Sequence, residues 1–139
     1  MAATASAQTR TTGIPGRFIL SAEGRHLVVD ASAATGGVAE AFVAQELLVG
    51  ALATCAQAVI SLKADEMGLT LRGVTVDVES SRDPDVRPPV YDGFTMDFEI
   101  SGASQDDAET LVTFFQENCP IYHTLASAAP MKVTIRAVA

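Results

Sequence analysis

The sequence predicts one α+β domain, spanning residues 13–139, in which antiparallel β-sheets pack on a long central helix. Three observations lead to this fold class. The composition is that of a packed globular chain, because 48% of the 139 residues are hydrophobic and 19% are charged. An uncharged run at residues 47–62 indicates one long helix. Two later segments alternate strictly between apolar and polar residues, which is typical of half-buried antiparallel strands.

Residues 1–12, MAATASAQTRTT, are predicted to form a flexible tail. They are mostly small and polar, and they lack the basic and apolar segments of a secretory signal. The segment GRFILSAEGRHLVVDAS has two β-rich runs, at 18–21 and 26–29, on either side of Glu23-Gly24. Two short runs around such a turn predict a β-hairpin.

A helix is predicted from about Ala44 to Met67. Gly50 is the one residue in this stretch that disfavours a helix, and Gly68 supplies a C-terminal stop. Because apolar residues lie on every side of the run at 47–62, we expect other structure to wrap most of the helix. The run is shorter than the roughly 20 residues that span a bilayer and contains Gln, Thr and Ser, so a buried helix is predicted rather than a membrane span.

The two alternating strands are predicted at 74–79 and 94–100, each with Thr, Asp and Glu on its polar face. A polar, Pro-rich loop joins them. Ser104 can cap a following helix, and a short helix then begins at Pro120. The segment MKVTIRAV, at 131–138, is predicted to be the last strand. The apolar stripe of the helix after Ser104 consists of Ala108, Leu111, Val112 and Phe115.

The charge balance argues against a nucleic-acid or anionic-membrane partner. The formal net charge is −8, and the nine Lys and Arg residues are scattered, whereas a phosphate-binding surface needs them clustered. Two cysteines without an export signal indicate a reducing, cytoplasmic compartment. There a permanent disulfide is not expected, whereas a transient one is compatible with the sequence.

The two cysteines occupy different local settings. Cys119 precedes Pro120, and because Pro favours the first helical position, either Cys119 or Asn118 becomes the N-cap of the short helix. The free N–H groups and the helix dipole favour a thiolate there. Cys55 lies mid-helix among apolar residues, where burial disfavours the thiolate. The residues alone therefore favour Cys119 as the more acidic thiol, and both are also compatible with small buried hydrophobes.

The segment QELLVGALATC, followed sixty-four residues after its cysteine by CPIYHTL, resembles the OsmC/Ohr family of thiol peroxidases, named for osmotically inducible protein C and organic hydroperoxide resistance protein. The order of hairpin, long helix, strand pair and helix leading into Cys-Pro also matches, from about residue 13. This resemblance implies an OsmC-like fold, an intertwined homodimer with active sites at the subunit interface, and a peroxidase that acts on organic hydroperoxides. No cofactor is predicted.

The resemblance also implies a role for each cysteine. Cys55 is the peroxidatic thiolate, which attacks the O–O bond and becomes a sulfenic acid. Cys119 is the resolving thiol, which forms a disulfide with Cys55 that a small dithiol or lipoyl-type reductant reopens. These roles reverse the preference drawn from the residues alone, and we follow the resemblance.

Proteins of this family pair the nucleophile with an Arg and a Glu. The Glu usually lies ten residues before the cysteine, where this chain has Gln45, followed by Glu46. Ten residues of straight helix span about 15 Å, so contact with the nucleophile requires a bend or a partner subunit. Gln45 can form hydrogen bonds but cannot anchor an Arg by charge. Glu46 is predicted to be a supporting carboxylate, the alternative being stabilisation of the helix N-terminus.

Arg17 is our choice for the supporting arginine because it begins the first strand. Arg10 and Arg25 are alternatives, and a solvated charge at a strand end is the plain structural interpretation of Arg17. His123 lies one helical turn after Cys119, and with His26 and Cys55 the set could suggest zinc. Structural zinc sites need four ligands that usually include a close Cys pair, so no metal is predicted; we prefer a polar cap on the short helix for His123.

Two other functions are compatible with these residues. One is a non-catalytic OsmC-like dimer that binds a small apolar ligand in its interfacial pocket. The other is a redox sensor, in which the same disulfide changes partner binding instead of clearing peroxide. Four phenylalanines belong to the core or in part line an apolar pocket: Phe94, Phe98, Phe114 and Phe115.

Overall fold

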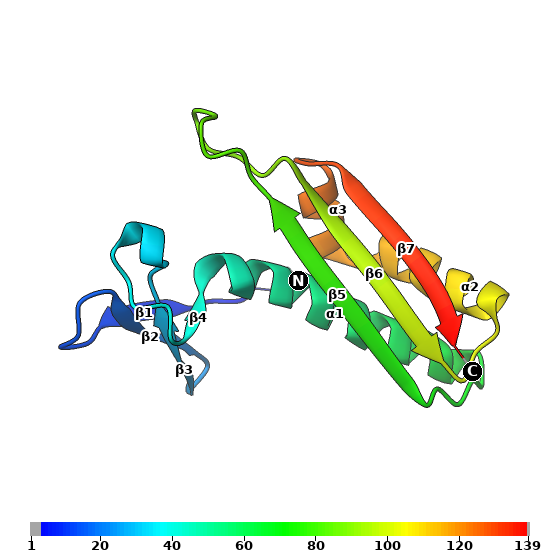
Figure 1. The fold of residues 1–139 in the computed structure, drawn as a ribbon. Helices are drawn as coiled ribbons and strands as arrows, with labels where there is room; N and C mark the ends of the chain where they lie inside the picture. The colour runs from blue at the N-terminus through cyan, green and yellow to red at the C-terminus, as the bar shows by residue number, and fades with distance from the viewer. Residues whose placement is uncertain (1–3, 139) are drawn as a thin grey trace. The chain divides into compact units, whose positions relative to one another are not determined.

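The computed structural model of the chain describes residues 4–138 (Figure 1). The chain forms two compact units, Met1–Leu48 and Val49–Ala139, each with its own β-sheet. Helices and two sheets make this an α+β fold, as predicted. The extent of a single domain over residues 13–139 stays a prediction.

The first unit contains a four-stranded sheet in the order β1-β2-β3-β4, coloured from blue to cyan in Figure 1. β2 is antiparallel to both β1 and β3, and β4 is parallel to β3. A short 3-10 helix, η1 (Ala33–Thr35), lies in the connection between β3 and β4. The strands are β1 (Gln8–Thr11), β2 (Arg17–Ala22), β3 (Arg25–Asp30) and β4 (Phe42–Val43).

The predicted hairpin is confirmed as β2 and β3. Ala22 lies opposite Arg25, which leaves Glu23 and Gly24 as a two-residue turn. Both turn residues have positive φ angles, 48° and 77°. A tight turn that matches the right-handed twist of the strands requires this conformation, and glycine adopts it without steric cost.

The structure differs from the predicted flexible tail over Gln8–Thr11. These four residues form β1, in which Thr9 lies opposite Leu20 of β2. All four residues are exposed, so the strand has no buried face. Its sequence therefore lacks the alternation of apolar and polar residues that would predict a strand. Its support comes from backbone hydrogen bonds to β2, which depend little on side-chain type. Residues 1–3 of the predicted tail lie outside the described residues.

The predicted long helix is present as α1 (Ala44–Glu66), 23 residues in length. It continues through Gly50 and ends before Gly68, whose φ of 69° is the left-handed conformation typical of a helix stop. The part of α1 in the second unit has one buried face, made of residues spaced by about one helical turn: Leu52, Ala56, Ile60 and Ala64.

The other sides of α1 remain uncovered within the second unit. Leu62, for example, is 57% exposed, whereas the sequence predicted that other structure would wrap most of the helix. By length and composition alone α1 is also apolar enough to cross a membrane, a test that core helices of water-soluble proteins pass as well. Its buried face belongs to the core cluster that includes Phe98 and Phe115, so within this unit it packs as a core helix.

The second unit also contains a three-stranded sheet in the order β5-β6-β7 and two helices. Figure 1 shows the helices on one face of this sheet, together with the second-unit part of α1. The elements are β5 (Gly73–Ser81), β6 (Gly93–Ser101), α2 (Gln105–Asn118), α3 (Pro120–Ala126) and β7 (Met131–Val138).

Both sheets are mixed, which corrects the prediction of antiparallel sheets. β5 and β6 are antiparallel, as predicted, but β7 runs parallel to β6. The connection from β6 to β7 contains α2 and α3, and such a helical crossover returns the chain to the end of the sheet where β6 began. In the first sheet, the long connection carrying η1 likewise places β4 parallel to β3.

The core of the second unit lies between its sheet and its helices. β6 alternates as predicted, with Phe98 buried and Asp97 exposed, and Asp97 lies directly opposite Asp77 of β5. The predicted cap of α2 is confirmed, because Ser104 Oγ accepts a hydrogen bond of 3.1 Å from the Asp107 N–H. The core cluster consists of Leu52, Ala56, Ile60, Ala64, Met96, Phe98, Ile100, Ala108, Leu111, Val112, Phe115 and Cys119.

Candidate functional site

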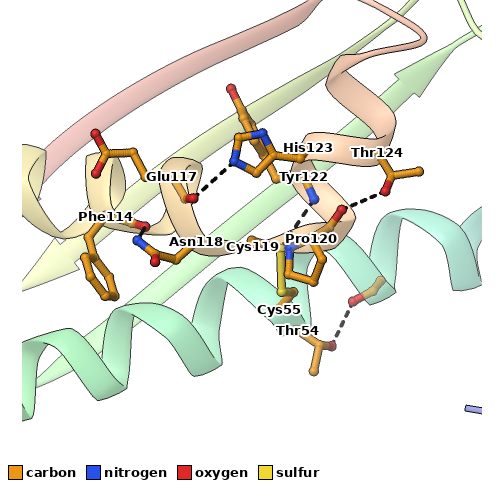
Figure 2. Close-up of a disulfide and its surroundings, with 11 residues drawn as sticks. Thr54, Cys55, Phe114, Glu117, Asn118, Cys119, Pro120, Tyr122, His123 and Thr124 are labelled. Atoms are coloured by element: carbon orange, nitrogen blue, oxygen red, sulfur yellow. Dashed lines mark hydrogen bonds between the residues drawn. A yellow bond between two sulfur atoms is a disulfide. The ribbon is translucent and has the colours of Figure 1, made fainter. Parts of the chain in front are cut away.

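Two segments that are distant in the sequence meet at a disulfide between Cys55 and Cys119 (Figure 2). Cys55 lies near the middle of α1, and Cys119 lies between α2 and α3. Their Cα atoms are 6.5 Å apart, although 64 positions separate the two residues in the chain. Disulfides require Cα atoms about 4.4–6.8 Å apart, so the fold of the second unit brings the two thiols within covalent reach.

The backbone around Cys119 is fixed from both sides. The residue has φ −87° and ψ 112°, an extended conformation that the following Pro120 favours. Its N–H donates to Phe115 O at 2.9 Å and so closes the last turn of α2. Its Sγ accepts the N–H of Tyr122 at 3.4 Å, so Cys119, and not Asn118, is the N-cap of α3.

The two cysteines differ in burial. Cys119 is 0% exposed and belongs to the core cluster of the second unit. Cys55 packs against that cluster but keeps part of its surface exposed. The disulfide therefore has one partner enclosed by the core and one partner at its border.

Side chains of α3 hold this short helix against the end of α2. The ring of Tyr122 contacts Phe115 edge-on, with ring centroids 5.3 Å apart, and its hydroxyl accepts a hydrogen bond from Gln116 at 3.0 Å. His123 Nε2 lies 3.1 Å from the carbonyl oxygen of Glu117, as the dashed line in Figure 2 shows. His123 thus makes a polar contact that ties α3 to the end of α2, and a polar cap on the short helix itself stays a prediction. The other histidine, His26, lies in the first unit and contacts Ser21.

In the first unit, Arg17 is the centre of a charged cluster. Its guanidinium donates to both carboxylate oxygens of Asp30, from Nε at 2.8 Å and from Nη2 at 2.9 Å. Nη2 also lies 2.9 Å from Glu40 Oε2. Asp30 is only 3% exposed, and its Oδ2 accepts the N–H groups of Glu40 and Ala41 at 3.0 Å each. The plain interpretation of Arg17 as a solvated strand-end charge is therefore wrong.

This cluster changes the proton affinity of its members. The hydrogen bonds from Arg17 hold the pKa of the Asp30 carboxyl well below its usual range, against the opposing effect of burial. The hydrogen bonds to Asp30 and Glu40 in turn raise the pKa of Arg17. Both shifts favour the charged forms, so the cluster fastens the connection between β3 and β4 to the start of β2. The predicted role of Arg17 toward Cys55 stays a prediction.

The two alternative arginines also lie in the first unit. Arg10 is an exposed residue of β1, and Arg25 pairs with Glu23 beside the hairpin turn, Nη2 to Oε2 at 2.7 Å. The arginines of the second unit that make polar contacts pair within their own loop or sheet. Arg87 donates to backbone oxygens of its own loop, and Arg136 pairs with Glu99 on the sheet.

Gln45 and Glu46 begin α1 and belong to the first unit. Glu46 Oε2 accepts the N–H of Val43 at 2.9 Å, a contact that satisfies a backbone donor just before the helix. This contact favours the alternative interpretation of Glu46, stabilisation of the helix N-terminus. Gln45 is exposed. Supporting roles for both residues at Cys55 stay predictions.

The disulfide and the two mixed sheets define a protein with a paired-cysteine site in an α+β fold. A sequence profile of the OsmC-like protein family matches residues 37–134, a stretch that contains both cysteines. The chain therefore belongs to the OsmC-like protein family. No curated protein matches the sequence.

Solved structures share the whole fold. An OsmC-like protein from Mycoplasma pneumoniae is 19% identical, with a TM-score of 0.88 and full coverage of both chains. An organic hydroperoxide resistance protein OsmC from Legionella pneumophila is 20% identical, with a TM-score of 0.79 and coverage of 100% of this chain and 99% of that chain. An organic hydroperoxide resistance protein from Elizabethkingia anophelis is 15% identical, with a TM-score of 0.81 and 99% coverage of each. At these identities the likeness shows a common fold.

The partners of two site residues did not follow from the sequence. Asp30 was not singled out, although an acidic residue at the end of the apolar run HLVV is a recognisable signal for a buried, paired carboxylate. The contact between Cys119 Sγ and the Tyr122 N–H follows from Cys119 occupying the N-cap position, one of two positions that the sequence left open.

Proposed function

We propose that this protein is a thiol-dependent peroxidase that reduces organic hydroperoxides. The observation that carries the proposal is the Cys55–Cys119 disulfide in an OsmC-like fold. Sulfur atoms joined in this way are the product expected when a peroxide oxidises one thiol and a second thiol traps the sulfenic acid. Two structural neighbours are organic hydroperoxide resistance proteins, which supports the same substrate class.

The proposed reaction oxidises the cysteine pair by two electrons. The Cys55 thiolate attacks the terminal oxygen of the hydroperoxide and the O–O bond breaks, which gives a sulfenic acid and, after protonation, an alcohol. The Cys119 thiolate then attacks the Cys55 sulfur, the S–O bond breaks and the hydroxyl leaves as water. A small dithiol or lipoyl-type compound reduces the resulting disulfide and is itself oxidised to a disulfide.

The proposal includes an intertwined homodimer in the cytoplasm, with α1 as its central helix. The uncovered apolar side of α1, where Leu62 is 57% exposed, supports this part, because a large apolar side chain is stabilised by burial. In the dimer, Arg17 with Gln45 or Glu46 would supply polar support to the Cys55 thiolate. Hydrogen bonds from a guanidinium favour a thiolate over a thiol.

A redox sensor is the second candidate, and one observation favours it. Arg17 already donates to two carboxylates, Asp30 and Glu40, so its guanidinium is less available to activate a thiolate. A sensor would form the same disulfide quickly but turn over slowly. The two functions therefore differ in the ratio between the rate of disulfide formation and the rate of hydroperoxide turnover.

A peroxidase assay with cumene hydroperoxide and dithiothreitol tests the proposal. The wild-type protein is expected to consume hydroperoxide in a thiol-dependent manner, and Cys55→Ser is expected to reduce the rate to that of the buffer. Cys119→Ser should still form a sulfenic acid on Cys55, detectable by its dimedone adduct, but no intramolecular disulfide. Absence of thiol-dependent turnover in the wild type, or turnover unchanged in Cys55→Ser, contradicts the peroxidase. Rapid disulfide formation with negligible turnover selects the sensor.

A further inference from the structure

The two sulfur atoms of the disulfide have different surroundings. Cys119 is 0% exposed, and its Sγ accepts the N–H of Tyr122. Cys55, on the side of α1 that borders the core, is partly exposed. The Cys119 sulfur therefore has a fixed hydrogen-bond donor and cannot be reached from solvent. Cys55, in contrast, can be reached.

We propose that the reductant attacks the sulfur of Cys55 and that Cys119 is the leaving group, received by the backbone N–H of Tyr122. The inference rests on the proposed function, because it specifies how the oxidised protein of that cycle is reopened. Tyr122 then acts as a positioning residue through its backbone N–H. The mixed disulfide formed during reduction joins the reductant to Cys55.

Access is the first argument for this direction. Thiol–disulfide exchange depends on which sulfur the attacking thiolate can reach. A thiolate that attacks Cys119 must enter the core cluster, where Cys119 packs with residues such as Phe115, both 0% exposed. An attacking anion in that apolar interior loses its hydration, and the Tyr122 N–H is already directed at Cys119 Sγ. Attack on Cys55 takes place at the border of the core and avoids this cost.

The leaving group is the second argument. Exchange is faster when the departing sulfur is better stabilised as a thiolate. The Tyr122 N–H already lies 3.4 Å from Cys119 Sγ in the disulfide, so the donor is in place when negative charge develops there. The edge contact of the Tyr122 ring with Phe115 and the hydrogen bond from Gln116 hold the residue in this position.

The exchange balances as two displacements. A thiolate of the dithiol forms a bond to Cys55 Sγ, the Cys55–Cys119 bond breaks, and Cys119 departs with the electron pair and takes up a proton. The second thiolate of the reductant then attacks the reductant sulfur bonded to Cys55, which closes the reductant's own disulfide and releases the Cys55 thiolate. The protein gains two electrons, and the dithiol loses two.

Trapping the mixed disulfide tests the proposal directly. The oxidised wild-type protein is exposed briefly to 2-mercaptoethanol, a monothiol that cannot complete the second displacement, then quenched with acid and alkylated with N-ethylmaleimide. Trypsin separates the cysteines, because Arg25 and Lys63 bound the Cys55 peptide, whereas the Cys119 peptide ends at Lys132. Mass spectrometry should find the mercaptoethanol adduct on Cys55 and the alkyl group on Cys119, in roughly tenfold excess over the reverse pattern.

Two variants test the part played by the Tyr122 N–H. Tyr122→Pro removes the N–H and the ring, whereas Tyr122→Ala removes the ring and keeps the N–H. Reduction of the disulfide is expected to be roughly tenfold slower in Tyr122→Pro than in Tyr122→Ala, the size of effect typical of a hydrogen bond to a charged group. Because proline at this position also disfavours the helical conformation of Ile121, the wild-type trapping pattern decides the proposal on its own.

The outcomes separate this inference from the proposed function. An adduct mainly on Cys119, equal adducts on both cysteines, or no adduct at all overturns the direction of attack, whatever the peroxidase assay shows. An adduct on Cys55 supports it even if hydroperoxide is not consumed, in which case the peroxidase proposal fails and the direction of reduction applies to a redox sensor.

Discussion

The two units hold their most constrained side chains in opposite ways. In the first unit, Arg17, Asp30 and Glu40 are joined by charged hydrogen bonds. In the second unit, Cys55 and Cys119 are joined covalently at the border of an apolar core. A buried carboxylate needs its cation at all times, whereas a cysteine pair can change oxidation state without leaving a charge buried. We therefore expect pH to act on the first unit and reductant to act on the second.

Reducing the disulfide is expected to produce the largest change in stability, confined to the second unit. The bond closes a loop between positions 64 residues apart, so its loss should lower the free energy of unfolding by about 4 kcal/mol through the entropy of the unfolded chain. Urea unfolding with and without dithiothreitol measures this difference. The control is the double variant Cys55→Ser with Cys119→Ser, which should not respond to dithiothreitol. Equal stability of oxidised and reduced wild type would contradict the expectation.

Gly37→Ala is expected to have the next largest effect, confined to the first unit. A Cβ atom at this position would lie 1.8 Å from the backbone oxygen of Ala31, which cannot move without disturbing the end of β3. The cost should reach about 3 kcal/mol, the size typical of a severe steric conflict. Hydrogen exchange over residues 4–48 measures it. Gly13→Ala is the matched control, because no atom lies within 4 Å of its added Cβ, and an equal effect of both changes would refute the argument.

Secondary-structure elements could be predicted mainly where apolar side chains recur at a regular spacing. β6 and α2 each bury one face of a regular pattern, so their existence and their core residues followed from the sequence. β1 could not be predicted, because an exposed edge strand needs only backbone partners. The direction of β7 was missed for another reason: its residues fit a strand of either orientation, and the helices before it decide which one forms.

The candidate site could be predicted only in its chemically distinctive residues. Cys55 and Cys119 were found because thiols are few in this chain and resemblance to a family paired them. The sequence signals Asp30 as a buried carboxylate, but the pairing of Arg17 with Asp30 and Glu40 could not be found, because these residues lie 13 and 23 positions away from Arg17. Long-range ion pairs of this kind follow from strand register, and one residue of shift would separate them.

Acidification is expected to weaken the first unit selectively. Arg17 lowers the pKa of Asp30, so the carboxylate contributes stability above the usual carboxyl range, and this contribution is lost as the pH falls toward the lowered pKa. Protection of the Glu40 and Ala41 N–H groups against hydrogen exchange should therefore decrease below about pH 4. Asp30→Asn should show low protection at every pH, and peptides around Cys119 should not follow the same profile. Unchanged protection of the wild type at low pH would contradict this prediction.

The smallest expected effect concerns the exposed face of the second sheet, which neither a charged cluster nor a disulfide secures. Asp77 and Asp97 lie directly opposite each other there, an arrangement that is destabilising for like charges. Asp97→Asn should raise the free energy of unfolding by a few tenths of a kcal/mol, and the gain should shrink at high salt because exposed charges are screened. A double-mutant cycle with Asp77→Asn measures the coupling. If the two substitutions add without coupling, the carboxylates do not repel each other, and this pair contributes nothing to the contrast between the units.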